Sequence, residues 1–282
     1  MKNIICYIIF GDNQDYYNSA KFSILNLLHF TKDTPTKIIV LTEKKQEFID
    51  YPVTSIGISK EQLSKWSLNR KYHFRIKNLG LQYIVKELNL SNDDKILFFD
   101  TDVYFKKNPL VLFSLIKESQ AVMFKNEGKI NKKKRFSYYQ NNLKDKIMQY
   151  GNNEKYTLSS NSEMWGSAII GIPGSAFSLV RSADALMLNL LNKLDVNMVH
   201  TIEQLSLVEV LKTKFKIIEG KKYIDIFSTS GKKHFALRQI NNFLKENKHQ
   251  DIVLLSELSL KLRVERSIFQ IIRDKILRWI KN

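Results

Sequence analysis

The sequence contains "KILFFDTDVYFKKNPL" (residues 95–110), in which an apolar run, residues 96–99, stands directly before two aspartates, Asp100 and Asp102. An apolar run of this length is typical of a buried strand. Side chains alternate along an extended chain, so residues two positions apart point the same way. The sequence therefore predicts that both carboxylates converge on one point at the end of a central strand.

A pair of neighbouring carboxylates calls for a compensating charge. Like charges held close together repel each other, and burying a carboxylate costs free energy unless it is protonated, paired or bound to a cation. Hard oxygen ligands favour Mg²⁺ or Mn²⁺, whose remaining positions are commonly filled by water and substrate phosphates. A simple turn after a strand is the alternative. The apolar residues on both sides of the Asp100–Asp102 pair favour a cation site.

An α/β rhythm surrounds this strand. Residues 3–10 form an apolar, β-branched run, residues 16–30 have helical spacing, and residues 36–43 form a second apolar run. A further helical stripe, residues 70–90, leads to the strand before Asp100. This order predicts a parallel sheet with ligands at the carboxyl ends of its strands. No G-x-G-x-x-G or G-x-x-x-x-G-K-[ST] motif follows the first run, which argues against a dinucleotide enzyme or a P-loop NTPase.

The composition predicts one catalytic-sized globular domain with an appendage. The chain has 282 residues, 44% of them hydrophobic, and a single cysteine, Cys6. One cysteine excludes an internal disulfide and a cysteine metal site, as expected in a reducing cytoplasm. Residues 1–17 are interpreted as the first strand and its turn, not as a signal peptide. No apolar run reaches the roughly 20 residues that span a bilayer, so any membrane association is expected to be peripheral.

The order of segments over residues 3–240 resembles the GT-A-fold nucleotide-sugar glycosyltransferases, especially the glycogenin-like and bacterial lipopolysaccharide galactosyl- and glucosyltransferase group. The resemblance rests on "RIKNLGL" (75–81) and "KILFFDTDVYFKKNPLVLF" (95–113), a helix before a strand that ends in D-x-D. It implies a Rossmann-like mixed α/β sheet flanked by helices over residues 1–255. It also implies transfer of a hexose from a nucleotide-diphospho-sugar, with a UDP-sugar favoured, to a glycan or lipid-linked acceptor in bacterial surface polysaccharide synthesis.

The resemblance assigns a metal to the D-x-D pair. Asp100 and Asp102 match the residues that hold a divalent cation, Mn²⁺ or Mg²⁺, against the donor diphosphate. His234, in "KKHFALRQ" (232–239), matches a late histidine that is the third metal ligand in the glycogenin-like group. Beyond His234 and Phe235 the motif departs, because its glycine and its Lys-Pro-Trp element are missing. This departure leaves the subfamily, and retention or inversion at the sugar, open.

Other matched positions lie along the donor nucleotide. Arg75 and Lys77 match basic residues near the donor, with Arg75 the favoured one of the two. Solvated charges on a helix face are the alternative for both. Asp12 and Tyr17 fall where the family contacts the base and the ribose, although Asp12 could instead cap the following helix.

The reacting sugar and the acceptor are matched by two later segments. Trp165 and Gly166, in "SSNSEMWGSAIIGIPG" (159–174), match a turn and strand beneath the donor sugar, and a core tryptophan is the alternative. Glu203 and Gln204 match an acidic residue and a glutamine at a helix start, where a first-turn carboxylate is also ordinary. Inversion would need Glu203 as a base, whereas retention would leave Glu203 or Gln204 supporting the donor sugar.

The net charge of +17 calls for an anionic partner, or reflects a compositional bias towards lysine. Basic residues cluster at 129–136 and in the last two dozen residues. We expect residues 256–282 to form a basic amphipathic helix that binds an anionic membrane surface at the cytoplasmic face. Packing of this helix on the domain, or formation of a homodimer, are the alternatives. The apolar stripe and the opposite cations are Ile268, Ile272, Ile276, Trp279, Arg266, Arg273 and Lys281.

A basic nucleic-acid-binding protein is the rival interpretation. It is supported by the charge and by "KKKRF" (132–136) followed by Tyr138 and Tyr139, a pattern suited to stacking on a single strand. A buried strand that ends in D-x-D supports only the transferase, because carboxylates repel phosphate unless a metal intervenes. No nucleic acid is therefore expected as a partner.

Overall fold

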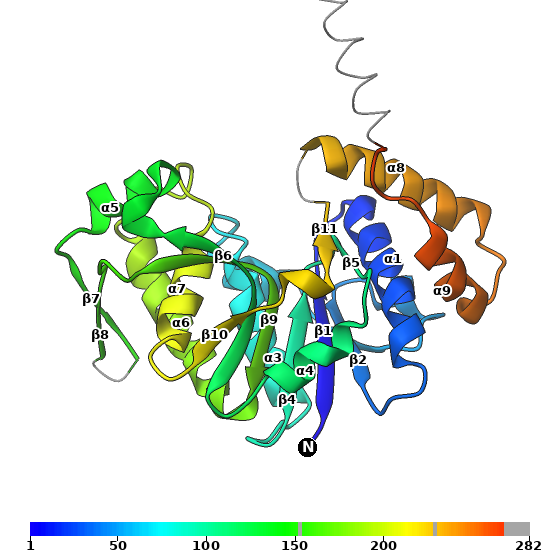
Figure 1. Cartoon of the computed structure of the whole chain (residues 1–282), viewed down its shortest axis with the longest axis horizontal. Helices are drawn as coiled ribbons and strands as arrows, with labels where there is room; N and C mark the ends of the chain where they lie inside the picture. The colour runs from blue at the N-terminus through cyan, green and yellow to red at the C-terminus, as the bar shows by residue number, and fades with distance from the viewer. Residues whose placement is uncertain (152–153, 228–229, 268–282) are drawn as a thin grey trace, which may run out of the picture.

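The computed structural model describes residues 1–151, 154–227 and 230–267. Within these residues the centre is a seven-stranded mixed sheet with helices on both faces (Figure 1). The predicted mixed α/β sheet flanked by helices is therefore confirmed. In spatial order its strands are β10 (Lys216–Glu219), β6 (Gln120–Lys129), β9 (Glu163–Pro173), β4 (Lys95–Phe99), β1 (Asn3–Ile9), β2 (Lys37–Thr42) and β3 (Thr54–Gly57).

Helices and two small antiparallel strand pairs surround this sheet. The helices are α1 (Gln14–Thr31), α2 (Lys60–Trp66), α3 (Arg75–Glu87), α4 (Leu112–Leu115), α5 (Ser137–Leu143), α6 (Phe177–Leu191), α7 (Ile202–Leu211), α8 (Ser230–Glu246) and α9 (Ile252–Lys261). The small pairs are β5 (Val103–Tyr104) with β11 (Asp225–Ile226), and β7 (Ile147–Tyr150) with β8 (Glu154–Thr157). Short 3₁₀ turns are Lys45–Phe48, Pro109–Val111, Ile130–Lys132, Lys134–Phe136, Gly174–Ala176 and Lys221–Tyr223.

The first half of the sheet is parallel, as the strand-helix-strand rhythm predicts. β1 pairs in parallel with β2 on one side and with β4 on the other, and β2 pairs in parallel with β3. β9 runs antiparallel to both β4 and β6, which makes the sheet mixed. Because β1 and β4 run the same way, the residues that follow them, Phe10 and Asp100, meet at one edge.

The two faces of the sheet bury different side chains of the same strands. Ile4 and Cys6 of β1 pack on one face with residues of α3, α6 and α7. Ile5 and Tyr7 pack on the other face with residues of α1 and α4. This alternation is what an apolar strand buried on both faces requires.

The helix before β4 begins later than the predicted residues 70–90. Leu68, Asn69 and Arg70 have φ values of 55°, 55° and 69°, in the left-handed region, so the chain becomes α-helical only at Arg75. Non-glycine residues rarely adopt this region, and three in succession cannot be anticipated from the sequence pattern. The turn delivers residues 71–74 to the edge where β1 and β4 end.

The C-terminal part packs against α1 and differs from the predicted single helix. α8 and α9 lie beside α1 (Figure 1), where Phe22 and Phe243 meet edge to face with ring centroids 6.5 Å apart. α9 crosses the predicted boundary at residue 256 and ends before Leu262, whose backbone is extended. One uninterrupted helix over 256–282 is therefore wrong, because residues 262–267 are not helical.

The amphipathic part of the predicted tail begins at Ile268 and lies outside the described residues. Its membrane-binding role stays a prediction. Among the helices that the structure does describe, none combines the length and the apolar character needed to cross a membrane.

Gly174 provides a test of the packing between the end of β9 and the turn before β4. Its N–H donates to the Asp94 carbonyl oxygen at 2.7 Å, and a Cβ there would overlap the carbonyl oxygen of Ser91. We expect Gly174→Ala to lower the free energy of unfolding by about 3 kcal/mol, because backbone atoms cannot rotate away as a side chain can. Urea unfolding followed by circular dichroism measures this change.

Gly57→Ala is the matched control. A Cβ at Gly57 would lie 3.6 Å from the Lys45 side chain, which is an ordinary contact, so the change should stay within about 0.5 kcal/mol. Equal unfolding midpoints for the two variants would contradict the close approach at Gly174.

Candidate functional site

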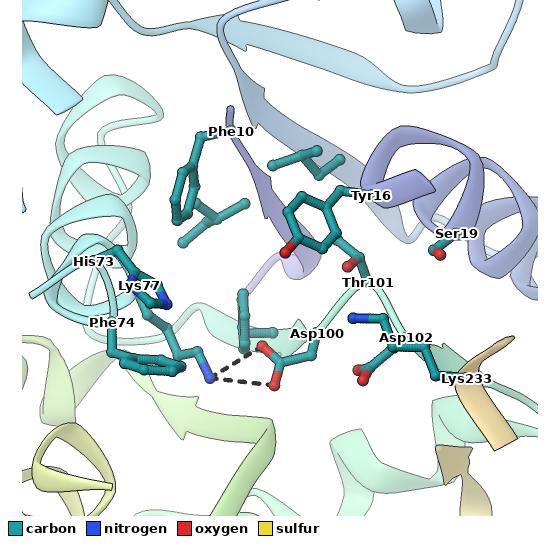
Figure 2. A pocket seen from close by; sticks show the side chains of 13 residues that line it. Phe10, Tyr16, Ser19, His73, Phe74, Lys77, Asp100, Thr101, Asp102 and Lys233 are labelled. Carbon is teal, nitrogen blue, oxygen red and sulfur yellow. Dashed lines mark hydrogen bonds and ion pairs between the residues drawn. The ribbon is translucent and has the colours of Figure 1, made fainter. Parts of the chain in front are cut away.

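A pocket of about 250 Å³ opens at the carboxyl ends of β1 and β4 (Figure 2). Its walls come from the end of β1, the first turns of α1, the segment that enters α3, the residues after β4, and Lys233 of α8. Five separate parts of the chain thus meet at one edge of the sheet. This is the edge at which open α/β sheets bind ligands.

Asp100 and Asp102 both line this pocket, which is the convergence that the sequence predicts. The backbone around them is held on both sides. The Asp100 N–H donates to the Ala168 carbonyl oxygen of β9 at 3.1 Å, and the Asp102 carbonyl oxygen accepts from the Phe227 N–H at 3.2 Å. The carboxylates therefore project from a segment that neighbouring strands fix in place.

Lys77 of α3 lines the pocket and is paired with Asp100 (Figure 2). Its Nζ is 3.0 Å from Asp100 Oδ1 and 3.3 Å from Glu203 Oε1. Nζ also donates to Ser167 Oγ at 2.9 Å, and that hydroxyl donates to Glu203 Oε1 at 2.6 Å. Burial alone would lower the pKa of Lys77, but the carboxylates of Asp100 and Glu203 raise it. The ammonium group is therefore charged and shared.

Glu203 is buried and does not line the pocket, so its role at the reacting sugar stays a prediction. Only 1% of its side chain is exposed, because Lys77 and Ser167 cover it. Its N–H donates to the Tyr72 hydroxyl at 3.0 Å, and that hydroxyl donates to the His200 carbonyl oxygen at 3.0 Å. Burial raises the pKa of Glu203, while Lys77 and the Ser167 hydrogen bond oppose the rise. The residue thus holds other groups in position.

Gln204, the other residue matched to the reacting sugar, does not line the pocket either. It is partly buried on α7, and among the described residues its Oε1 atom has no hydrogen-bond partner. Its predicted catalytic role stays a prediction.

Asp100 and Asp102 are electrostatically unlike. Asp100 is paired with Lys77. Burial and the neighbouring Asp100 charge raise the pKa of Asp102 to about 6, and Lys233 and Lys77 oppose this rise. The ionised form of Asp102 is therefore the form that a positive ligand would stabilise.

The two carboxylates fit a hard divalent cation that takes its remaining ligands from water and phosphate. Within residues 1–151, 154–227 and 230–267, no group of three His, Cys, Asp or Glu side chains could hold a metal ion. His234 is exposed on α8, and its neighbour Lys233 lines the pocket. Successive helical residues point about 100° apart, so one of the two faces elsewhere. His234 as a third ligand stays a prediction that this placement does not favour.

Tyr16, not the predicted Tyr17, faces the pocket (Figure 2). Tyr17 is fully buried, and its hydroxyl donates to the Gly11 carbonyl oxygen at 3.0 Å. The Tyr16 ring is 42% exposed, and Lys233 Nζ lies 5.3 Å from its centroid. The sequence pattern marks both tyrosines, but the phase of α1 decides which one is accessible.

Asp12 lies outside the pocket lining. Its side chain is 83% exposed and 3.5 Å from Lys44 Nζ. Helix α1 is capped by Asn13, whose side chain accepts from the Asp15 N–H at 2.9 Å. Asp12 therefore neither lines the pocket nor supplies the cap that the alternative interpretation gave it.

Arg75, which the sequence favours over Lys77 as a contact of the donor, forms an ion pair within the protein. Its Nε and Nη2 atoms donate to the two carboxylate oxygens of Asp184, both at 2.8 Å, which ties α3 to α6. Residues two positions apart on a helix point to nearly opposite sides, so Lys77 faces the pocket and Arg75 does not. Arg75 as a donor contact stays a prediction that this ion pair does not favour, whereas Lys77, the other matched basic residue, lines the pocket.

Trp165 and Gly166 belong to the interior of the sheet and do not line the pocket. Trp165 is buried, and its Nε1 donates to Glu163 Oε2 at 3.3 Å, so its ring offers no face to a sugar. Gly166 pairs with Lys125 across β6 and β9. The functional contact in this segment comes from the next residue, Ser167, through its hydrogen bonds to Lys77 and Glu203.

The strained turn before α3 brings two further residues to the pocket that the sequence analysis did not identify. His73 and Phe74 line one wall, with ring centroids 4.1 Å apart. The turn is held by Ser67, whose carbonyl oxygen accepts from the Tyr72 N–H at 2.9 Å and whose hydroxyl accepts from the Arg70 N–H at 3.1 Å. Consecutive left-handed residues cost free energy and persist only where surrounding contacts fix them.

Comparison with known proteins gives a likeness of fold. No family profile and no curated protein matches the chain. Similar solved structures include the galactosyltransferase LgtC with donor and acceptor sugar analogues (10% identity, 76% of this chain and 72% of that chain, TM-score 0.48). Mouse xyloside xylosyltransferase 1 shares 10% identity over 77% of this chain and 85% of that chain, with a TM-score of 0.46.

A third similar structure is a glycosyltransferase involved in glycosylation of the major capsid of PBCV-1. It shares 10% identity over 86% of this chain and 100% of that chain, with a TM-score of 0.44. Identities and scores of this size carry no inference about activity. The chemistry must be derived from the pocket itself.

Lys77 provides a test of the shared ion pair. We expect Lys77→Met to lower the free energy of unfolding by about 3 kcal/mol, because Glu203 would be left buried without its counter-charge. In Lys77→Met/Glu203→Gln no buried charge remains uncompensated, so the double variant should be more stable than the single one. Urea unfolding of both variants measures the difference.

Lys71→Met is the matched control, since Lys71 is exposed six residues before Lys77, and its loss should stay within about 0.5 kcal/mol. A Lys77→Met variant as stable as this control would show that the ammonium group does not stabilise the pocket.

Proposed function

We propose that the chain is a metal-dependent glycosyltransferase that moves a sugar from a nucleotide-diphospho-sugar, preferably a UDP-sugar, to a glycan or lipid-linked acceptor. The observation that carries this proposal is the pair Asp100 and Asp102, both in one pocket at the carboxyl ends of β1 and β4. The same two residues carry the resemblance of the sequence to this class of enzyme.

The charges around the pocket suit a diphosphate. Mn²⁺ or Mg²⁺ bound by Asp100 and Asp102 would stabilise the negative charge that develops on the leaving diphosphate. Lys77 is already shared between Asp100 and Glu203, whereas Lys233 reaches the pocket from α8 on the side of Asp102 (Figure 2). Lys233 is therefore the lysine placed to contact a phosphate oxygen.

The aromatic side chains suit the remainder of a nucleotide sugar. Tyr16 exposes part of its ring to the pocket and can stack on a planar base. Phe10, Phe74 and Phe98 provide apolar walls that exclude water from the sugar–phosphate bond, where water would hydrolyse the donor. Glu203 acts through Lys77 and Ser167 as a positioning residue.

The structure buries aromatic rings that the rival nucleic-acid interpretation needs for base stacking. Tyr139 is buried, and its hydroxyl hydrogen-bonds with Thr201 Oγ1 at 2.8 Å. Phe136 is buried as well. A single strand that approached residues 132–136 would meet lysines but few exposed rings, so the pattern no longer favours base stacking.

The wider setting of the reaction rests on the sequence alone. A hexose as the transferred sugar, a role in bacterial surface polysaccharide synthesis, and attachment to the inner membrane face through residues 268–282 belong to this proposal as expectations. Homodimer formation is an alternative use of the same C-terminal segment.

Asp102→Asn tests the metal assignment. The substitution removes charge but little volume, so manganese-dependent UDP binding should weaken by about 100-fold or more and donor hydrolysis should be lost. The protein should stay folded, because the change also removes the repulsion between Asp102 and Asp100. Calorimetric titration with UDP and Mn²⁺, and a hydrolysis panel of nucleotide sugars, measure the two effects.

Asp33→Asn, an exposed aspartate after α1, is the matched control and should change neither quantity. In the wild-type protein UDP with Mn²⁺ should raise the melting temperature and a chelator should reverse the rise. Undiminished donor hydrolysis by Asp102→Asn would contradict the assignment of Asp102 as a metal ligand.

The neighbours Lys233 and His234 distinguish a phosphate contact from a metal ligand. Lys233→Ala should weaken UDP binding about tenfold at saturating Mn²⁺, since it removes a charged partner of the diphosphate. His234→Ala should raise the Mn²⁺ concentration needed for half-saturation only if the histidine moves to join the carboxylates. His249→Ala is the exposed-histidine control. If Lys233→Ala binds UDP as the control does, the phosphate contact is excluded.

A further inference from the structure

A lobe beside the pocket is not explained by donor binding. It consists of residues 129–151 and 154–160, which include α5, β7 and β8, and it lies at the end of the molecule opposite α1 and α9 (Figure 1). None of its residues lines the pocket that holds Asp100. Its surface nevertheless differs from the rest of the chain in charge and in polarity.

The lobe is fastened to the segment that leads to Glu203. The Tyr139 hydroxyl hydrogen-bonds with Thr201 Oγ1 at 2.8 Å, and the Tyr138 hydroxyl accepts from the Asp195 N–H at 3.1 Å. Glu203 in turn is paired with Lys77, which lines the pocket. The lobe thus has a fixed position relative to the donor pocket, across the start of α7.

Positive charge is concentrated on this lobe. Residues 129–160 contain eight of the 45 Lys and Arg residues and only two of the 28 Asp and Glu residues. Arg135 is paired with Glu127 at 2.9 Å. Lys132, Lys133 and Lys134 are exposed, and in the part of the chain that the structure describes no ion pair involves them. Three adjacent cations are therefore available to an anionic ligand.

A polar hollow of about 780 Å³ adjoins these lysines. Five of its eight lining residues are amides or hydroxyls, namely Asn131, Gln140, Asn141, Ser159 and Ser160, and the other three are Lys144, Asp145 and Leu158. The amides of Asn131, Gln140 and Asn141 make no hydrogen bond with other described residues. Amides that both donate and accept suit the vicinal hydroxyl groups of a sugar. Asn131 directly precedes Lys132, and Lys144 lines the hollow itself, so cations lie in the hollow and next to it in the chain.

Other polyanions fit this surface less well. Base stacking needs exposed rings, and Tyr139 and Phe136 are buried. A membrane surface would need apolar side chains to insert, and Ile147 is the only large one exposed on the described part of the lobe. Charge, together with amides and hydroxyls, is the chemistry of an acidic carbohydrate.

We propose that this lobe binds an anionic glycan. Glycan hydroxyls occupy the hollow lined by Asn131, Gln140 and Asn141, and acidic groups of the glycan, phosphate or carboxylate, lie against Lys132, Lys133 and Lys134. If the chain is the proposed transferase, the anionic glycan is its acceptor, and this assignment rests on the proposed function. The binding itself is a property of the lobe.

The test is a binding titration of the full-length wild-type chain with polymers that share one backbone. The probes are neutral dextran, carboxymethyl dextran and dextran phosphate of equal length, with an oligothymidylate and phosphatidylglycerol vesicles as competitors. Both acidic dextrans, or one of them, should bind, with an affinity that falls as salt rises, and neutral dextran should bind at least about tenfold more weakly. The two acidic arms identify the acidic group.

Two variants locate the binding surface. Lys132→Gln/Lys133→Gln/Lys134→Gln should weaken binding of acidic dextran about tenfold, since three exposed charge contacts are lost. Asn131→Leu/Asn141→Leu should also weaken it, by removing hydrogen bonds at unchanged charge. Lys245→Gln/Lys248→Gln/Lys261→Gln removes the same charge from exposed positions on and after α8 and on α9, and should bind as the wild type does.

The proposal is overturned if the control triple variant loses as much affinity as the lobe variant, or if Asn131→Leu/Asn141→Leu binds like the wild type. It is also overturned if Lys132→Gln/Lys133→Gln/Lys134→Gln loses affinity for oligothymidylate or for vesicles but keeps its affinity for acidic dextran. Vesicle binding through residues 268–282 would not change in that variant. Manganese-dependent UDP binding by the wild-type chain, measured alongside, reports on the donor pocket separately. If the wild-type chain binds acidic dextran but not UDP with Mn²⁺, the proposed transferase function is wrong and the proposed glycan binding by the lobe stands.

Discussion

The pocket depends on one buried ammonium group. Lys77 Nζ lies between the carboxylates of Asp100 and Glu203 and donates to Ser167, so α3, β9, α7 and the end of β4 share a single positive charge. Without it, the Asp100 and Glu203 carboxylates would lack the counter-charge that they share, and Glu203 would be buried unpaired at a cost of several kcal/mol. The ion pair therefore both stabilises the fold and fixes where Asp100 can point.

This arrangement makes two neighbouring aspartates different. Lys77 satisfies Asp100 within the protein, whereas the pKa of Asp102 is raised by burial and by the Asp100 charge. A positive ligand would lower this pKa by stabilising the ionised form of Asp102. Lys233 of α8 acts in the same direction. Asp100 thus has its counter-charge within the protein, whereas a bound cation would favour the ionised form of Asp102.

The sequence could predict the sheet and the carboxylate pair, because both follow from short-range periodicity. The apolar run before Asp100 is long enough to be a strand, and alternation then brings Asp102 to the same pocket. The sequence could not predict which side chains of a helix point into the pocket. Of the two matched basic residues on α3, Lys77 lines the pocket and the favoured Arg75 pairs with Asp184. On α1, Tyr16 lines the pocket and the matched Tyr17 is buried. Phase at a helix start depends on caps and turns, and here a left-handed turn of ordinary residues precedes α3 without a sequence signature.

Basic and acidic residues are distributed unevenly between the pocket and the lobe of residues 129–160, which a uniform bias towards lysine does not explain. Among the Lys, Arg, Asp and Glu residues that line the pocket, Lys77 and Lys233 balance Asp100 and Asp102, so the pocket contributes nothing to the net charge of +17. A uniform bias towards lysine would spread its excess along the chain, together with the acidic residues that are present. Instead, acidic residues are scarce in the lobe of residues 129–160, where amides and hydroxyls accompany the cations. The lobe's eight basic and two acidic residues give it a net charge of +6, so it attracts an anionic molecule more strongly than the balanced charges of the pocket lining do.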